Sequence, residues 1–272
     1  MPTHARAVLS ILGLAFVALV PQAQAQTGLS DGIAHPRRVR SFIGVYQEEQ
    51  APVSTQLVRM GLGDGLFLMA GRTGGVRYHI ELAAAVQAEF DLAVSSFDFL
   101  VADFIVGVPI RLARGRWSGR VAIYHQSSHL GDDILSRDDV TPGVDGAVDF
   151  EAVEGFLGYR LGPLHPYLGA EYRFRRTPDG QDPSVLHAGV DIKSRGEGTY
   201  GLFAGVHGWT ADQGIDPWGG SVRVGLELRR SGRGAGRRPV RLLLEGMAGS
   251  PDAGRFYRLR RGTFGFAVEV GR

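Results

Sequence analysis

The chain has 272 residues, of which 44% are hydrophobic and 21% are charged, and 30 basic against 28 acidic side chains give a formal charge of +2. This near balance favours no polyanionic partner, and we expect no binding of nucleic acid. The absence of cysteine excludes disulfides, thiolate metal sites and a cysteine nucleophile. The 40 glycines suit tight turns and bends in curved sheets.

The first 25 residues have the pattern of a secretory signal peptide. His4 and Arg6 precede an apolar run at 7–20, and the small-x-small sequence Ala-Gln-Ala follows at 23–25. The run is shorter than the ~20 apolar residues that a spanning helix needs. We therefore expect export, cleavage before Gln26, and a mature chain 26–272 with no transmembrane helix.

Residues 76–91 carry the most informative pattern in the chain. Apolar side chains hold nearly every second position, and charged or polar side chains such as Arg77, Glu81 and Glu89 lie between them. Period two over this length predicts one β-strand, far longer than the ~5–6 residues of an ordinary strand. A long strand with one apolar and one charged face is typical of outer-membrane barrels, whose lipid face is apolar and whose lumen is polar.

The same alternation recurs along the chain and predicts one domain of about 12 strands. The predicted strands are 38–48, 55–72, 76–91, 99–113, 116–128, 147–161, 165–175, 184–194, 198–209, 218–230, 238–248 and 262–271. Links after even strands are mostly short and links after odd strands mostly longer, as between the periplasmic and external loops of such barrels. We therefore predict an all-β, transmembrane antiparallel β-barrel located in the outer membrane.

Charged side chains on the predicted inner faces have mixed signs. They are Arg77, Glu81, Glu89, Asp103, Arg111, Arg120, Glu171, Arg173, Asp191, Arg223, Glu227, Arg241, Glu245 and Glu269. We expect them to pair in the lumen together with His79, His187 and His207, which favours a plugged barrel over a wide pore. Aromatic residues near strand ends are expected in interface girdles: Trp117, Trp209, Trp218, Tyr159 and Tyr167.

The strand that ends at residue 128 carries a polar pair on its apolar face. Arg120 and Gln126 mark one face as luminal, and Ser128 belongs to it, so His125 and Ser127 are expected to face lipid near the outer end. Exposing polar groups to lipid costs free energy, which favours a functional explanation. Because residues i and i+2 share a face, the imidazole can reach the hydroxyl and take its proton.

An outward-facing His-x-Ser motif of this kind resembles two enzyme families, outer-membrane phospholipase A and the outer-membrane lipid A deacylase. Both use the histidine as general base and the serine as nucleophile, oriented by an asparagine or a glutamate on the neighbouring strand. The resemblance implies a catalytic set of Ser127, His125 and Glu151, since Glu151 is expected outward on the next strand. Twelve strands resemble the phospholipase more than the eight-stranded deacylase.

A longer stretch, from about Ser41 onward, resembles a family of uncharacterised bacterial exported proteins. The residues that carry it lie at 98–103, 107–109 and 124–132. No established activity is attached to that family, so this resemblance implies an envelope location and no reaction.

Two classes of function therefore stay open. The first is hydrolysis of acyl esters in phospholipid or lipid A, with outer-leaflet lipids as partners. The second is a non-enzymatic structural barrel, adhesin or narrow channel, in which the polar pair caps a strand at the rim. No cofactor is predicted, although calcium could bind an acidic loop that is otherwise simply solvated: Asp132, Asp133, Asp138, Asp139, Asp145 and Asp149. Oligomeric state and the oxyanion donors are left open.

Overall fold

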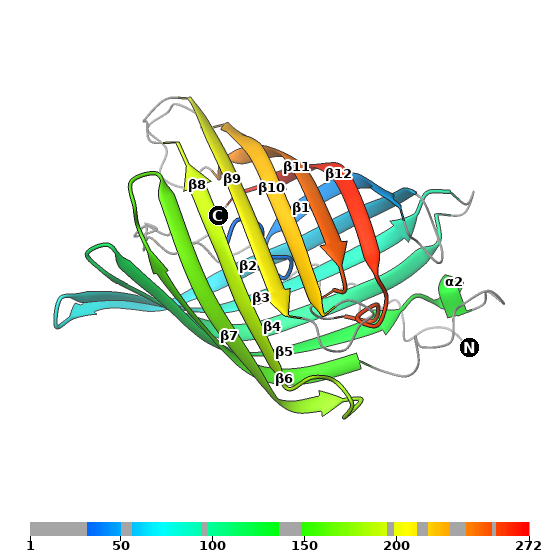
Figure 1. Ribbon diagram of the computed structural model, residues 1–272, viewed down its shortest axis with the longest axis horizontal. Coiled ribbons are helices and arrows are strands. Elements are labelled where there is room, and N and C mark those ends of the chain that lie inside the picture. The colour runs from blue at the N-terminus through cyan, green and yellow to red at the C-terminus, as the bar shows by residue number, and fades with distance from the viewer. Residues whose placement is uncertain are drawn as a thin grey trace.

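The computed structural model describes residues 32–49, 56–93, 97–135, 148–194, 199–210, 217–228, 238–251 and 254–271. These residues form a closed antiparallel barrel in which neighbouring strands of the chain pair and β1 pairs with β12 (Figure 1). The predicted all-β barrel of 12 strands is confirmed. The expected signal peptide, residues 1–25, lies outside the described residues.

The strand bounds follow the alternating pattern closely. They are β1 (Ser41–Glu48), β2 (Gln56–Thr73), β3 (Val76–Asp91), β4 (Phe99–Arg114), β5 (Trp117–Leu130), β6 (Val148–Tyr159), β7 (Leu164–Thr177), β8 (Ser184–Lys193), β9 (Tyr200–Thr210), β10 (Trp218–Leu228), β11 (Val240–Gly249) and β12 (Arg261–Val270). A short helix, α2 (Asp132–Leu135), follows β5. Within the described ranges, no helix is long and apolar enough to cross a membrane.

Each strand presents an apolar face to the outside and a polar face to the lumen. Along β1, Ile43 and Val45 are exposed while Phe42, Tyr46 and Glu48 are buried. An apolar exterior of this kind is typical of a barrel that is surrounded by lipid. A closed barrel also pairs its backbone polar groups between strands, as lipid requires.

The predicted pairing is seen for most of the luminal charges, but Arg77 is exposed near the end of β3 and forms no ion pair with the described residues. The pairs include Arg40–Glu245, Arg111–Glu81, Arg223–Glu245, Arg241–Glu269 and Arg261–Glu89, with N–O distances of 2.5–2.8 Å. Their side chains are almost entirely buried, so each charge is compensated by its partner and not by bulk water.

The lumen is also filled by chain that belongs to no strand. The N-terminal segment, residues 32–40, runs inside the barrel, where Ile33 donates its amide to Asp191 at 2.8 Å and Arg223 donates to the Ile33 carbonyl at 2.7 Å. A Cβ at Gly205 would lie 2.7 Å from that of Ile33, so only glycine lets the segment approach β9 this closely. Residues 255–257, between β11 and β12, are buried as well. Both segments therefore occupy part of the lumen.

Four details differ from the sequence-based expectations. β1 begins at Ser41 and not at residue 38, because the preceding residues turn into the lumen. Trp209 and Tyr167 are buried in the lumen and not in a girdle, whereas Trp117 and Trp218 are exposed as expected. The alternation of side chains along a strand decides which face a residue lies on, whether or not the residue is aromatic. The fourth difference is a bulge in β7, which affects the candidate site.

Candidate functional site

The C-terminal half of β5 carries the predicted histidine and serine on its apolar face. His125 and Ser127 are half-buried and alternate with Gln126 and Ser128, which are each 1% exposed and face the lumen. Ile123, on the same face as His125, is 55% exposed. The structure therefore places His125 and Ser127 on the apolar exterior.

Glu151 lies directly opposite His125 on β6. The two residues are register partners, and the distance from His125 Nδ1 to Glu151 Oε1 is 3.4 Å. The His125 side chain is 40% exposed and the Glu151 side chain is 27% exposed, so the pair is at the surface of the barrel. With Nδ1 directed at the carboxylate, Nε2 is the nitrogen left to act on a hydroxyl.

Arg175 on β7 lies on the other side of Glu151 from His125, a position that the sequence did not predict. Its Nη1 lies 3.5 Å from Glu151 Oε1, and its side chain is 75% exposed. Regular alternation put Arg175 in the lumen with Arg173. The register shifts between Glu151 and Ala152, which pair with Arg175 and Arg173, so Phe174 is an extra residue and the facing changes beyond it. No local sequence signal marks this bulge.

The β4 side of the site is apolar. Phe104 is the register partner of Ser127, Val106 is that of His125, and both are exposed. Within the described part of the chain, no hydrogen bond joins the Ser127 hydroxyl to His125 or to another residue, whereas Ser128 Oγ accepts the Arg255 amide at 3.0 Å. The structure therefore brings His125 to Glu151 but does not bring the imidazole into hydrogen-bond contact with the serine. The luminal serine is thus committed to the fold.

The acidic residues proposed for calcium do not all lie in the described ranges. Asp132 and Asp133 are in α2, where Asp133 Oδ2 accepts the Phe99 amide at 2.9 Å. Asp149 lies on β6 opposite Ser127. The other three, Asp138, Asp139 and Asp145, are outside the described residues.

Comparison with solved structures identifies barrels of the same fold. The outer-membrane phospholipase of Salmonella typhi, solved as a dimer with bound calcium, superposes with a TM-score of 0.59 at 13% identity, covering 87% of this chain and 93% of that one. Outer-membrane phospholipase A from Escherichia coli gives 0.58 at 13% identity, covering 90% and 95%. Identities this low show the fold alone.

Sequence comparison gives a family without an assigned activity. No curated protein matches the chain. A family model described as "Protein of unknown function (DUF1207)" matches residues 67–271, which include ten complete strands and the whole candidate site. The chain therefore belongs to this family of proteins of unknown function, DUF1207.

Proposed function

We propose that this chain is an outer-membrane protein that hydrolyses acyl esters of outer-leaflet lipids at His125, Ser127 and Glu151. The observation that carries the proposal is the His125–Glu151 pair, which lies on an apolar exterior beside a serine with no partner among the described residues. Similarity to the fold of two outer-membrane phospholipases supports the location and makes a lipid the natural substrate class.

The reaction gives each of the three residues one role, and it requires a side-chain rotation that brings His125 Nε2 to Ser127 Oγ on the face that they share. Ser127 Oγ attacks the acyl carbonyl while His125 Nε2 takes its proton, and the Glu151 carboxylate stabilises the imidazolium that forms. Collapse of the tetrahedral adduct transfers the proton from His125 to the departing lipid alcohol and leaves an acyl-serine. Water, deprotonated by His125, then releases the fatty acid and restores Ser127.

The position of the site fits a substrate that diffuses within the membrane. Exposed Phe104 and Val106 on β4 offer apolar surface to an acyl chain on one side of the serine. Arg175 lies on the opposite side, beyond Glu151, and its cation suits an anionic headgroup. A substrate can therefore reach Ser127 without entering the lumen.

The filled lumen favours this proposal over a channel. The N-terminal segment crosses the interior, and Arg40 within it is held by Glu245 and Glu269 at 2.6 and 3.3 Å. The cavity that remains beside these residues has a volume of about 130 Å³. Conduction would require this ion-paired segment to leave.

The test is hydrolysis of phospholipid and of lipid A by purified, refolded protein in mixed micelles. We expect the parent to release fatty acid, Ser127→Ala to lose that activity, and Ser128→Ala to keep it, because the Ser128 side chain is luminal. Assays with added calcium and with a chelator examine calcium dependence, since the Salmonella enzyme was solved with bound calcium. Activity lost in Ser128→Ala but kept in Ser127→Ala would refute the assignment.

Export and location have separate tests. We expect the protein to cofractionate with outer-membrane markers and to change its electrophoretic mobility on heating. The mass of the mature protein should be that of a chain that begins at Gln26. Recovery as a soluble periplasmic protein would contradict a membrane barrel. A parent protein that is correctly located but hydrolyses neither lipid would favour the structural barrel or adhesin.

A further inference from the structure

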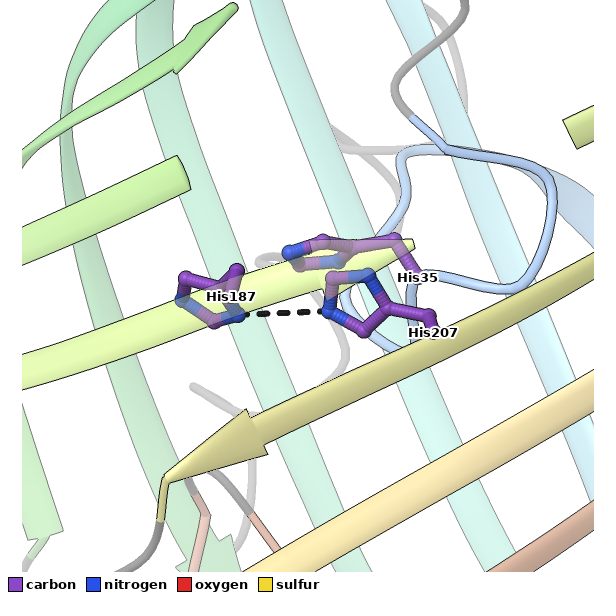
Figure 2. Close-up of side chains that lie close together, drawn as sticks. All are labelled: His35, His187 and His207. Atoms are coloured by element: carbon purple, nitrogen blue, oxygen red, sulfur yellow. Dashed lines mark hydrogen bonds between the residues drawn. The ribbon is translucent and has the colours of Figure 1, made fainter. Parts of the chain in front are cut away.

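Three buried histidines lie close together in the lumen of the barrel. His187 belongs to β8, His207 to β9, and His35 to the N-terminal segment (Figure 2). His187 Nδ1 and His207 Nε2 are 3.2 Å apart, and one ligand atom from each of the three rings lies within 4.8 Å of the other two.

We propose that His35, His187 and His207 bind one divalent transition-metal ion, with Zn²⁺ the best match, and that the ion fastens the N-terminal segment to the barrel wall. The proposal is independent of lipid hydrolysis, because these side chains are luminal and the His125 site is external.

The spacing of the two wall histidines is that of a metal site. Zn–N bonds of about 2.0–2.1 Å at a near-tetrahedral angle put two ligand nitrogens about 3.2–3.4 Å apart. The two nitrogens are 3.2 Å apart and share a hydrogen bond in this structure (Figure 2), so an ion would take the place of that hydrogen bond with little change in their spacing. His35 is the ligand that has to approach, and since its ligand atom lies within 4.8 Å of the other two, the approach is at most about 1.5 Å. It lies in a segment outside the strands, where such a movement breaks no ladder hydrogen bond.

His207 has an outer partner of the kind that supports metal ligands. Tyr167 Oη lies 3.0 Å from His207 Nδ1, on the side of the ring away from the cluster. Glu171 Oε2 lies 4.0 Å from His187 Nε2, a separation that is too long for a hydrogen bond, so this acid contributes only its charge. A ligating histidine commonly directs its second nitrogen at a carboxylate or another polar group, which sets the tautomer and the ring orientation.

His35 provides an observation that hydrogen bonding alone leaves unexplained. The residue is 5% exposed, and its Nε2 is buried with no hydrogen-bond partner, although buried polar atoms are nearly always paired. Ligation through Nε2 puts the ring proton on Nδ1 and releases the 3.2 Å hydrogen bond from the Arg37 amide.

The experiment uses untagged mature protein, refolded in detergent and freed of metal with a chelator. Titration with Zn²⁺ followed by calorimetry, and with Co²⁺ followed by its visible absorption, should give one site per chain and a tetrahedral Co²⁺ spectrum. We expect His35→Ala to bind at least tenfold more weakly. His165→Ala is the matched control, because His165 is a buried luminal histidine that contacts Ser118 at 2.8 Å, and this variant should bind like the parent.

A stability measurement guards against a folding defect in the variants. Zn²⁺ should raise the unfolding temperature of the parent and of His165→Ala, because a ligand that binds only the folded state stabilises it. It should not raise that of His35→Ala or His207→Gln. Equal binding by the parent and His35→Ala, or a parent with no one-to-one site, would overturn the proposal.

Discussion

The outer face of β5–β6 and the inner face of β7–β9 use the same kinds of residue in different ways. His125 stands 3.4 Å from Glu151 on the exterior, and His187 stands 4.0 Å from Glu171 in the lumen. Glu171 also accepts hydrogen bonds from Arg37 and Arg173, each at 2.6 Å. The luminal acid is thus part of a dense set of ion pairs, whereas the outer pair is surrounded mainly by apolar side chains.

The difference indicates which polar groups need a functional explanation. Luminal charges compensate one another, and their presence is accounted for by the interior of the barrel. An outward histidine and glutamate have no such role in a wall that is mainly apolar, where Arg175 is their charged neighbour, and they cost free energy in lipid. Four changes test this contrast.

Loss of the outer base or nucleophile should have the largest effect. We expect His125→Ala and Ser127→Ala each to lower the rate of lipid hydrolysis by roughly a thousandfold or more, and the double variant to be no worse than either, because base and nucleophile act as a unit. Initial rates in mixed micelles measure this. Additive losses would separate the two residues and contradict the shared step.

Removal of a luminal acid should instead destabilise the fold. Glu245→Ala leaves Arg40 and Arg223 buried without their shared partner, and we expect a loss of about 3–5 kcal/mol in the free energy of unfolding. Asp64→Ala, which breaks the exposed pair with Arg238, is the control and should cost about 1 kcal/mol or less. Urea unfolding in detergent compares them. Equal, small losses would indicate a wide, hydrated lumen.

The orienting acid should matter less than the base that it orients. We expect the Glu151→Gln variant to hydrolyse lipid roughly 10–100 times faster than the His125→Ala variant, although more slowly than the parent. The amide can still position the ring, but it does not compensate the charge of the imidazolium. The stability of the variant should change little, since the pair is partly exposed. A Glu151→Gln enzyme as active as the parent would remove Glu151 from the site.

The smallest effect is expected at the inward neighbour of the nucleophile. Ser128→Ala removes the acceptor of the Arg255 amide and should cost about 1 kcal/mol of stability, with no loss of hydrolysis. Thermal unfolding and the micelle assay measure the two effects. Loss of hydrolysis in a fully folded Ser128→Ala protein would mean that the serines face the opposite way.

The strands and their facing were predictable because period two is a local property of the sequence. It placed β3 at its observed bounds and put His125, Ser127 and Glu151 on one surface. The contribution of Arg175 was not predictable, because one extra residue in β7 reverses the facing beyond it. His35 was missed for another reason: no strand contains it, and its contacts with β8 and β9 join residues far apart in sequence.

Covalent labelling of the nucleophile tests the central claim most directly. A serine-reactive phosphonate with a long alkyl chain, applied to the refolded parent in detergent and located by mass spectrometry of peptides, should modify Ser127 alone. His125→Ala should abolish the modification, because the unassisted hydroxyl is a weak nucleophile. Labelling of Ser128, or a correctly folded parent that takes up no label, would contradict an outward-facing serine hydrolase.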